Sequence, residues 1–240
     1  MRTFLGIFFV ILAFKLSAQL SSLERIRQLS DSEKHKEVIA LSSSEIKKLK
    51  TTDSLYKKII TIRVYSYMAL MDFKSAILDY NTLTTFSPKN TDYYNGLAYA
   101  YWALGNDPDC LISIHKAYEI DKKNVGTLSN MAFYYNEAGK FSQGLKFATS
   151  GLEQNPDQHN KATLLNNRGY SHIGLKEYEL ALKDINESAI ILPDNSFVYY
   201  YRVLANIGLN KTETVCEDLK KCKSLGGDNL TAQLLPKYCN

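Results

Sequence analysis

The residue types that carry most enzyme chemistry are scattered along this chain of 240 residues. The sequence contains no HExxH zinc motif, no GxSxG nucleophile motif, and no GxGxxG or GxxxxGK[ST] phosphate-binding motif. The four histidines lie far apart, at His35, His115, His159 and His172. Acidic residues around the last histidine have the spacing of exposed helix faces, with an acid–base pair as the alternative: Glu177, Glu179, Asp184 and Glu187. We therefore expect a protein that is not an enzyme, with no catalytic residue, no metal site and no cofactor.

The cysteines do not form a redox or metal-binding motif either. No CxxC pair is present, and no cysteine lies in a cluster with histidine. The chain has four of them, Cys110, Cys216, Cys222 and Cys239. Four cysteines allow three complete sets of disulfide pairs, so their number alone leaves the pairing open.

The first 18 residues have the features of a secretory signal peptide. Arg2 supplies the positive charge, residues 4–14 are apolar, and Ala18 ends the segment with a small side chain. An apolar run of 11 residues is too short to cross a bilayer; an uncleaved anchor or a buried helix is the alternative. We expect cleavage after Ala18 and no membrane insertion of the mature chain. Cleavage leaves 27 basic against 25 acidic residues, a balance that favours neither nucleic acid nor an anionic membrane.

A pattern of about 34 residues repeats along most of the chain. Small residues mark it at Ala76, Cys110, Gly144 and Ala181, with spacings of 34, 34 and 37 residues. A proline follows twelve residues after three of these four positions. We expect the three extra residues to lie in a polar loop at 157–161, between two repeats.

Within each repeat, apolar residues recur at spacings of three and four, which predicts pairs of amphipathic helices. In one repeat the two helices should cover about residues 91–104 and 107–120. Glycine-containing breaks at 138–140 and 174–176 separate the helices of the next two repeats. Each repeat is therefore predicted to be a helical hairpin.

Small residues let the two helices of a hairpin approach closely, as we expect for Gly169 and Ala181. The predicted fold is all-α: an α-solenoid of about five antiparallel hairpins with terminal helices. The five repeats should begin near residues 57, 91, 125, 162 and 196. The expected segments are the signal peptide at 1–18, a divergent helical pair at 19–56, the repeat array at 57–228 and a capping helix at 229–240.

This pattern resembles the tetratricopeptide repeat, in which small, aromatic and proline positions recur over 34 residues. The resemblance covers about residues 57–226, with the first position of the signature relaxed to Ile60, Tyr94, Leu128 and Leu165. His172 occupies a position at which other repeats have tyrosine, so we expect it to be a packing residue. The resemblance implies a protein-interaction scaffold whose first helices line a concave surface.

The C-terminal stretch resembles the ends of secreted tetratricopeptide proteins from Gram-negative bacteria. The matching residues are Cys216, Asp218, Leu225-Gly226 and Tyr238-Cys239. This resemblance implies export to the periplasm or outside the cell, where disulfides persist. Within it we favour a disulfide between Cys216 and Cys239, with Cys110 and Cys222 as buried small residues.

Two columns of residues would face the concave surface that the family implies. One column is aromatic and the other is polar, so together they offer apolar area and groups that bond a peptide backbone. The competing interpretation is that the aromatic column packs between neighbouring hairpins. The predicted contact residues are Tyr65, Asn95, Tyr99, Trp102, Phe133, Asn166 and Tyr170.

Some tetratricopeptide proteins clamp a C-terminal carboxylate on this surface with basic residues and asparagine. Here the corresponding places hold only amides, at Asn95, Asn130, Asn166 and Asn167. We therefore expect the partner to be another protein, bound through an extended and largely uncharged peptide segment, and not nucleic acid. The competing hypothesis is a structural subunit of an envelope complex that assembles through its outer surfaces. The pattern leaves the partner's identity and the oligomeric state open.

Overall fold

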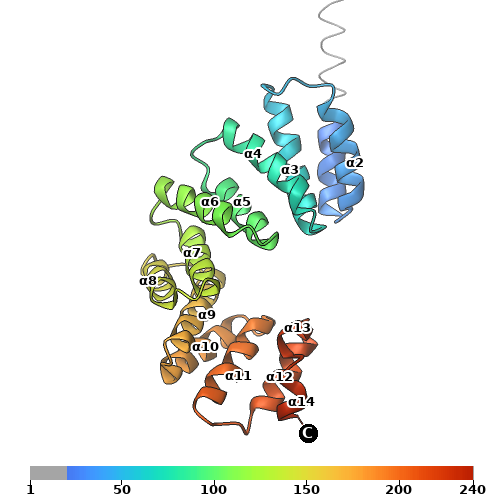
Figure 1. The fold of residues 1–240 in the computed structure, drawn as a ribbon. Helices are drawn as coiled ribbons and strands as arrows, with labels where there is room; N and C mark the ends of the chain where they lie inside the picture. Colours follow the sequence, from blue (N-terminus) through green and yellow to red (C-terminus); the bar gives the residue numbers. More distant parts are fainter. Residues whose placement is uncertain (1–20, 240) are drawn as a thin grey trace, which may run out of the picture. The chain divides into compact units, whose positions relative to one another are not determined.

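The computed structural model describes residues 21–239, so the expected signal peptide at 1–18 lies outside the described residues. Within them the chain forms helices joined by turns and short loops, and no strand (Figure 1). None of the described helices is long and apolar enough to cross a membrane. The predicted all-α class is confirmed.

Successive helices pair as hairpins. Before the repeats, a helix over residues 21–31 is followed by α2 (His35–Ile46). The five hairpins are α3 (Ser54–Ala69) with α4 (Phe73–Phe86), α5 (Thr91–Ala103) with α6 (Asp107–Ile120), α7 (Val125–Glu137) with α8 (Phe141–Leu152), α9 (Gln158–Gly174) with α10 (Tyr178–Ile191), and α11 (Ser196–Gly208) with α12 (Val215–Ser224). Two short helices follow, α13 (Asp228–Thr231) and α14 (Leu235–Tyr238). The helices predicted at 91–104 and 107–120 are α5 and α6, to within one residue.

The chain divides into two units between Ser113 and Ile114, within α6, and each unit has its own core. In the first unit, the helix over 21–31, α2 and α3 pack around Ile26 and Val38. In the second unit, α9 packs against its partner α10 and also against the first helices of the neighbouring hairpins, α7 and α11. First helices therefore contact first helices, which places their outward faces on one side of the unit.

The turn inside each of the five hairpins carries one residue in the left-handed region. These residues are Met71, Gly105, Gly139, Lys176 and Asn210, with φ between 58° and 71°. Glycine adopts this conformation without steric cost, which explains Gly105 and Gly139. In the break predicted at 174–176, however, the left-handed residue is Lys176, and Gly174 belongs to α9. A Cβ atom on Gly174 would overlap the ring of Phe141, so this glycine serves packing rather than the turn.

Asparagine and aspartate side chains fix where the first helices begin. Asn90, Asn124 and Asn195 each accept a hydrogen bond from a backbone N–H in the first turn of α5, α7 and α11. Asp157 does the same for α9, and the bonds donated by Asn160 lower the pKa of its carboxyl group. The prediction of a polar loop at 157–161 was wrong, because this cap adds the extra residues to the start of α9.

Small residues allow the close approach of the helices within each hairpin. Ala76, Cys110 and Ala181, which mark the repeat, are almost fully buried in the second helices. A Cβ atom on Gly169 would overlap Ile185 and lie 3.3 Å from the carbonyl oxygen of Ala181. The contact predicted between Gly169 and Ala181 is therefore present, and any larger residue at Gly169 would separate α9 from α10.

The C-terminal cap consists of two short helices rather than the single helix expected at 229–240. Pro236 lies in the first turn of α14, where its missing N–H removes no helical hydrogen bond. Further along a continuous helix the same proline would interrupt the hydrogen-bond ladder. Apolar side chains from the cap, including Leu234 and Tyr238, pack against Val215 and Leu219 of α12.

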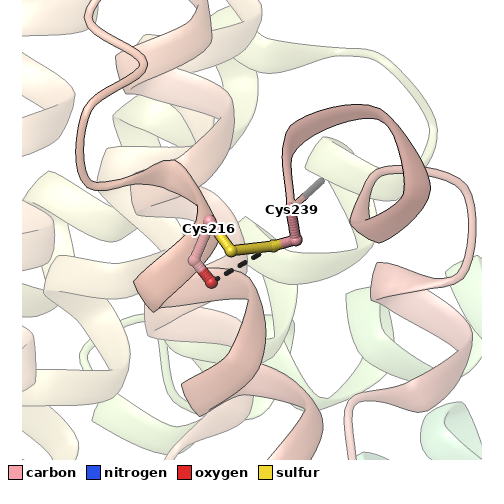
Figure 2. Close-up of a disulfide and its surroundings, with 2 residues drawn as sticks. All are labelled: Cys216 and Cys239. Atoms are coloured by element: carbon pink, nitrogen blue, oxygen red, sulfur yellow. Dashed lines mark hydrogen bonds between the residues drawn. A yellow bond between two sulfur atoms is a disulfide. The ribbon is translucent and has the colours of Figure 1, made fainter.

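A disulfide between Cys216 and Cys239 joins the end of this cap to α12 (Figure 2). This is the pairing that the resemblance to secreted proteins implied. A link that closes a loop of this length contributes roughly 3 kcal/mol in the chain-entropy model. Cys110 and Cys222 are unpaired and buried, and burial together with Asp107 raises the pKa of Cys110 to about 12.

The number of reactive thiols should therefore depend on folding and on reduction. In the native, unreduced protein at neutral pH we expect no reaction with a thiol reagent such as DTNB, because both free cysteines are buried. Two thiols should react in denaturant, and four after reduction. Four reactive thiols in denaturant alone would contradict the disulfide, and rapid labelling of the native chain would contradict the burial.

Candidate functional site

In the first unit, the outward face of α3 and α5 carries the exposed aromatic side chains. Tyr65 is 57% exposed and Tyr99 is 44% exposed. The ring centroid of Tyr99 lies 6.0 Å from that of Phe73 and 5.8 Å from that of Trp102. Asn95, one turn before Tyr99 on α5, and Trp102 are both partly buried. The structure thus brings Tyr99 and Trp102 into contact, with Asn95 on the same helix.

The hydroxyl end of Tyr65 lies in a partly apolar, negatively charged environment. Partial burial raises the pKa of Tyr65, and the negative charge of Asp92 adds to the effect. The phenol therefore stays protonated at neutral pH and can donate a hydrogen bond as well as accept one. The Tyr65 hydroxyl can therefore bond to a peptide backbone while the Tyr65 ring covers apolar surface of the same partner.

In the second unit, the predicted contact residues are more deeply packed. Tyr170 stacks on Tyr201 with ring centroids 4.4 Å apart and an angle of 5° between the planes. Phe141 also contacts Tyr170, edge-on, with the two ring centroids 5.8 Å apart. Phe133 is partly buried and lies edge-on to Tyr134 at 5.4 Å. The two interpretations of the aromatic column therefore divide between the units: exposed at Tyr65 and Tyr99, packed between hairpins at Tyr170.

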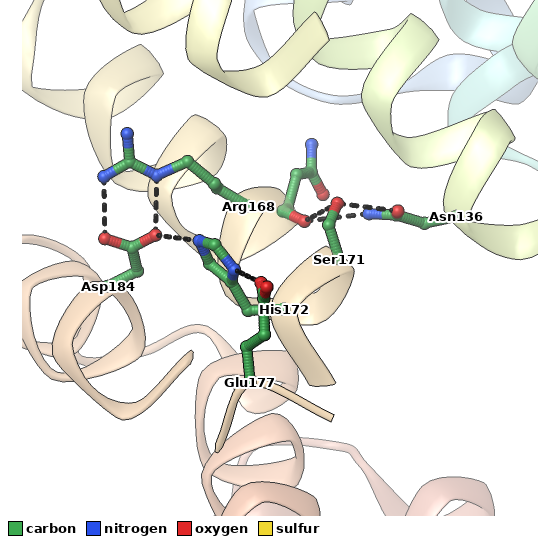
Figure 3. Close-up of polar contacts among 7 residues, drawn as sticks. Asn136, Arg168, Ser171, His172, Glu177 and Asp184 are labelled. Atoms are coloured by element: carbon green, nitrogen blue, oxygen red, sulfur yellow. Dashed lines mark hydrogen bonds and ion pairs between the residues drawn. The ribbon is translucent and has the colours of Figure 1, made fainter. Parts of the chain in front are cut away.

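Two buried amides of the second unit, Asn136 and Asn167, hold first helices together. Asn136 donates to the carbonyl oxygen of Asn167 at 2.8 Å, and Ser171 donates to Asn136 at 2.8 Å (Figure 3). Asn167 in turn donates to the carbonyl oxygen of Ser129 at 3.1 Å. Asn136 and Asn167 therefore join α7 to α9 rather than face a partner.

Asn166 differs from these neighbouring amides. It is only 5% exposed, and its side-chain oxygen accepts no hydrogen bond from the described residues. A buried acceptor without a donor costs about 1–3 kcal/mol. Among the predicted contact residues of this unit, Asn166 is the one whose hydrogen bonding the described fold does not satisfy.

Comparisons with known proteins identify the fold. No family model matches the sequence, and no curated protein matches it. Among solved structures, one similar chain belongs to the APC/C hetero-tetramer Cut9–Hcn1, with a TM-score of 0.78 and 14% identity; the match covers 92% of this chain and 43% of that one. A tetratricopeptide repeat protein from Parabacteroides merdae matches with a TM-score of 0.73 and 18% identity, over 92% of this chain and 84% of the other.

A third similar structure is PilW, described as a widely conserved type IV pilus biogenesis factor. It matches with a TM-score of 0.65 and 14% identity, over 78% of this chain and 91% of its own. The helical hairpins and these matches agree. The chain has the tetratricopeptide-repeat fold.

Three of the tetratricopeptide hairpins contain an ion pair with a buried aspartate that sequence reasoning missed. Arg63, Arg168 and Arg202 on the first helices each bond an aspartate sixteen residues later on the second helix, Asp79, Asp184 and Asp218. Each guanidinium donates to both carboxylate oxygens, with Nε–oxygen distances of 2.6–2.8 Å. The bonds to Asp184 raise the pKa of the Arg168 guanidinium. An arginine followed by an aspartate at this fixed spacing, in phase with the repeat, was the available signal.

The third tetratricopeptide hairpin fills the same positions with apolar side chains. Met131 and Phe147 stand where the fourth hairpin has Arg168 and Asp184, 37 residues later in each case. Phe147 stacks on Tyr135 with centroids 5.4 Å apart and an angle of 12°. The position of Tyr135 corresponds to that of His172. One place in the hairpin thus accepts either an apolar stack or an ion pair.

His172 is a largely buried structural residue, as expected, with 12% of its side chain exposed, and it hydrogen-bonds to Glu177 within the hairpin instead of stacking as Tyr135 does. Its Nδ1 lies 2.7 Å from a carboxylate oxygen of Glu177, and its Nε2 lies 3.9 Å from Asp184 (Figure 3). Asp184 is already engaged by Arg168, and no group of three acidic, histidine or cysteine residues suited to a metal ion occurs in the part of the chain that the structure describes. The network therefore joins α9 to α10 and to the turn between them.

An exchange between hairpins tests whether the ion pair stabilises the fold. Arg168→Met alone should lower the free energy of unfolding by about 2–4 kcal/mol, because Asp184 is left buried without its partner. Arg168→Met combined with His172→Tyr and Asp184→Phe installs the apolar set of the third hairpin, and should recover most of that loss. Urea unfolding followed by circular dichroism measures both.

Two results would contradict a stabilising role for the ion pair. If Arg168→Met unfolds at the same urea concentration as the wild type, the pair contributes nothing measurable. If the triple variant is less stable than the single one, the two hairpins do not use equivalent packing at these positions. Met131→Leu, a change of apolar shape at the matched position, serves as the control.

Proposed function

We propose that this protein is an exported tetratricopeptide scaffold that binds an extended segment of another protein on the outward face of its first helices. The observation that carries the proposal is the exposure of Tyr65 and Tyr99, 57% and 44%, on a face formed by consecutive first helices. Tyrosine supplies a large contact area with few rotatable bonds, so it loses little entropy when a partner is bound. We propose no catalytic role.

An extended peptide suits this face better than a folded partner. Its backbone offers N–H and C=O groups at regular intervals, and the face offers hydroxyl and amide groups beside the rings, from Thr61, Tyr65 and Asn95. In the second unit, the side-chain oxygen of Asn166 lacks a donor. Because helix packing already fixes this face, the scaffold itself loses little conformational entropy when the peptide binds.

Two observations support export. The sequence of residues 1–18 has the form of a secretory signal, and the chain carries a disulfide between Cys216 and Cys239, a bond that persists in oxidising compartments. PilW, a structurally similar protein, is described as a widely conserved type IV pilus biogenesis factor. Counting the thiols of protein taken from its own cells tests export, since reduced Cys216 and Cys239 there would contradict it.

A second candidate function is assembly through the outer surfaces, formed by the second helices. Leu78 on α4 is 70% exposed and Ile112 on α6 is 68% exposed, at equivalent positions of two successive repeats. Ile190 on α10 is 83% exposed. The similar Cut9–Hcn1 chain is itself part of a hetero-tetramer. Apolar side chains at these positions favour a contact surface separate from the first-helix face.

Selection from a display library of random peptides distinguishes the two functions. The wild-type chain, from Gln19 onward, should enrich peptides. The variant Tyr65→Ser/Tyr99→Ser should bind the recovered peptides at least about tenfold more weakly, because it removes two aromatic contacts. Fluorescence anisotropy with labelled peptides measures the affinities, and melting curves check that each variant is folded.

The matched control is Leu78→Ser/Ile112→Ser, which removes two exposed apolar side chains from the second helices of the same unit. This control should keep the wild-type affinity. Loss of binding in the control with retention in the tyrosine variant would move the site to the outer surfaces. Failure of the wild type to enrich any peptide would contradict the peptide-binding proposal.

A further inference from the structure

A pocket of about 510 Å³ opens on the first-helix face of the first unit. Its lining comes from three successive first helices: Arg27 from the helix over 21–31, Lys57, Lys58, Thr61 and Ile62 from α3, and Tyr93 from α5. The sequence analysis compared only the asparagine positions of the repeats, so it missed Lys57 and Lys58 at the start of α3 as well as Arg27 in the divergent pair. The N-terminal pair supplies one wall of the pocket.

The charge of this pocket is of one sign. Three of its lining residues are cationic, Arg27, Lys57 and Lys58, and none is acidic. Arg27 lies 3.9 Å from Glu24, in a pair whose two side chains are 52% and 62% exposed, so the contact neutralises it weakly. Lys57 donates to the neutral hydroxyl of Ser87 at 2.5 Å. An anionic group entering the pocket would meet positive charge with no carboxylate in the lining, and Glu24 would compete with it for Arg27.

The floor of the pocket is apolar. Tyr93 is only 8% exposed and belongs to the core of the first unit, while Ile62 packs against the core formed with the N-terminal helices. Neither side chain can turn away without disturbing a core. A ligand that combines a carboxylate with an adjacent apolar group therefore fits this pocket better than a free inorganic anion, which would leave the apolar floor in contact with water.

The pocket continues the face that carries the exposed tyrosines. Thr61 lies one helical turn before Tyr65 on α3, so the two share a side of that helix. From the pocket toward Tyr65 the charge changes from positive to negative. Lys58 lines the pocket, whereas the negative charge of Asp92 is felt at Tyr65, whose pKa it raises. First helices flank α3 on both sides, so a bound segment can pass across the pocket instead of ending in it.

We propose that this pocket binds the side-chain carboxylate of an internal aspartate or glutamate in the extended segment, with an adjacent apolar residue against Ile62 and Tyr93. The inference rests on the proposed function and deepens it: the segment is anionic at one position, contrary to the largely uncharged segment expected from the repeats. Lys58 and Arg27 attract the carboxylate, and Asp92 disfavours its placement beside Tyr65.

Three matched sets of immobilised peptides test the proposal. In the first set both termini are blocked and each peptide carries one glutamate beside leucine or phenylalanine. The second set replaces this glutamate by glutamine. The third set also has glutamine, but leaves the C-terminal carboxylate free. The wild-type chain should bind members of the first set about fivefold more tightly than their counterparts in the second, and this difference should shrink at high salt.

The variant Arg27→Gln/Lys58→Gln should lose the preference for glutamate while keeping its affinity for the glutamine peptides. The control Lys74→Gln/Lys89→Gln removes the same charge from exposed positions outside the pocket in the same unit, and should keep the preference. All four substituted side chains are exposed, so the variants should fold as the wild type does.

The remaining outcomes separate this inference from the proposed function. Equal binding of the first two sets by the wild type would overturn the acidic pocket and leave peptide binding intact. A preference for the third set would assign the pocket to a chain end and overturn the internal side chain. Binding to none of the sets would overturn both proposals. Loss of the glutamate preference in the Lys74/Lys89 control would show that the preference comes from the net charge of the protein, and would overturn the pocket.

Discussion

The structure depends on the close approach of the two helices in each hairpin. Ala76, Cys110 and Ala181 are almost fully buried where the second helix meets the first, and at Gly169 a single added carbon would strike Ile185. Backbones this close leave little room for large side chains between them, so the remaining inward positions must be filled either by well-packed apolar groups or by polar groups that satisfy each other. The arginine–aspartate pairs of the first, fourth and fifth hairpins and the Tyr135–Phe147 stack of the third are two solutions to that one requirement.

The same requirement decides which side chains remain for binding. Aromatic residues that face the neighbouring hairpin are used for packing, as in the stack of Tyr170 on Tyr201, and the buried amides Asn136 and Asn167 bond from α9 to α7. In the first unit, Tyr65 and Tyr99 keep much of their surface in water, and the Arg27–Lys58 pocket adds charge beside them. The repeated architecture thus provides rigid positions, and single substitutions within it decide whether a position packs or binds.

Much of the architecture follows from the sequence, because its period is carried by small residues and by helical spacing that any member of the fold must keep. The boundaries of α5 and α6 were predicted to within one residue. Other features depend on contacts between distant residues. The loop expected at 157–161 is mostly helix because Asp157 caps α9 there. Lys176 takes the left-handed turn position that Gly139 holds 37 residues earlier, while Gly174 makes room for Phe141. Of the predicted site, the distinction between exposed Tyr99 and packed Tyr170 required the position of Tyr201, which repeat spacing does not reveal.

The central claim is that the first-helix face of the first unit is the surface that meets the partner. Photo-crosslinking in the native cells tests it most directly, with a benzophenone amino acid placed at Tyr65 or Tyr99 and, as controls, at Leu78 or Ile112 on the second helices. The account predicts that positions 65 and 99 crosslink to one and the same protein, and that positions 78 and 112 do not. Crosslinks to a protein from positions 78 and 112 alone would contradict it, and would assign recognition to the outer surface of the hairpins.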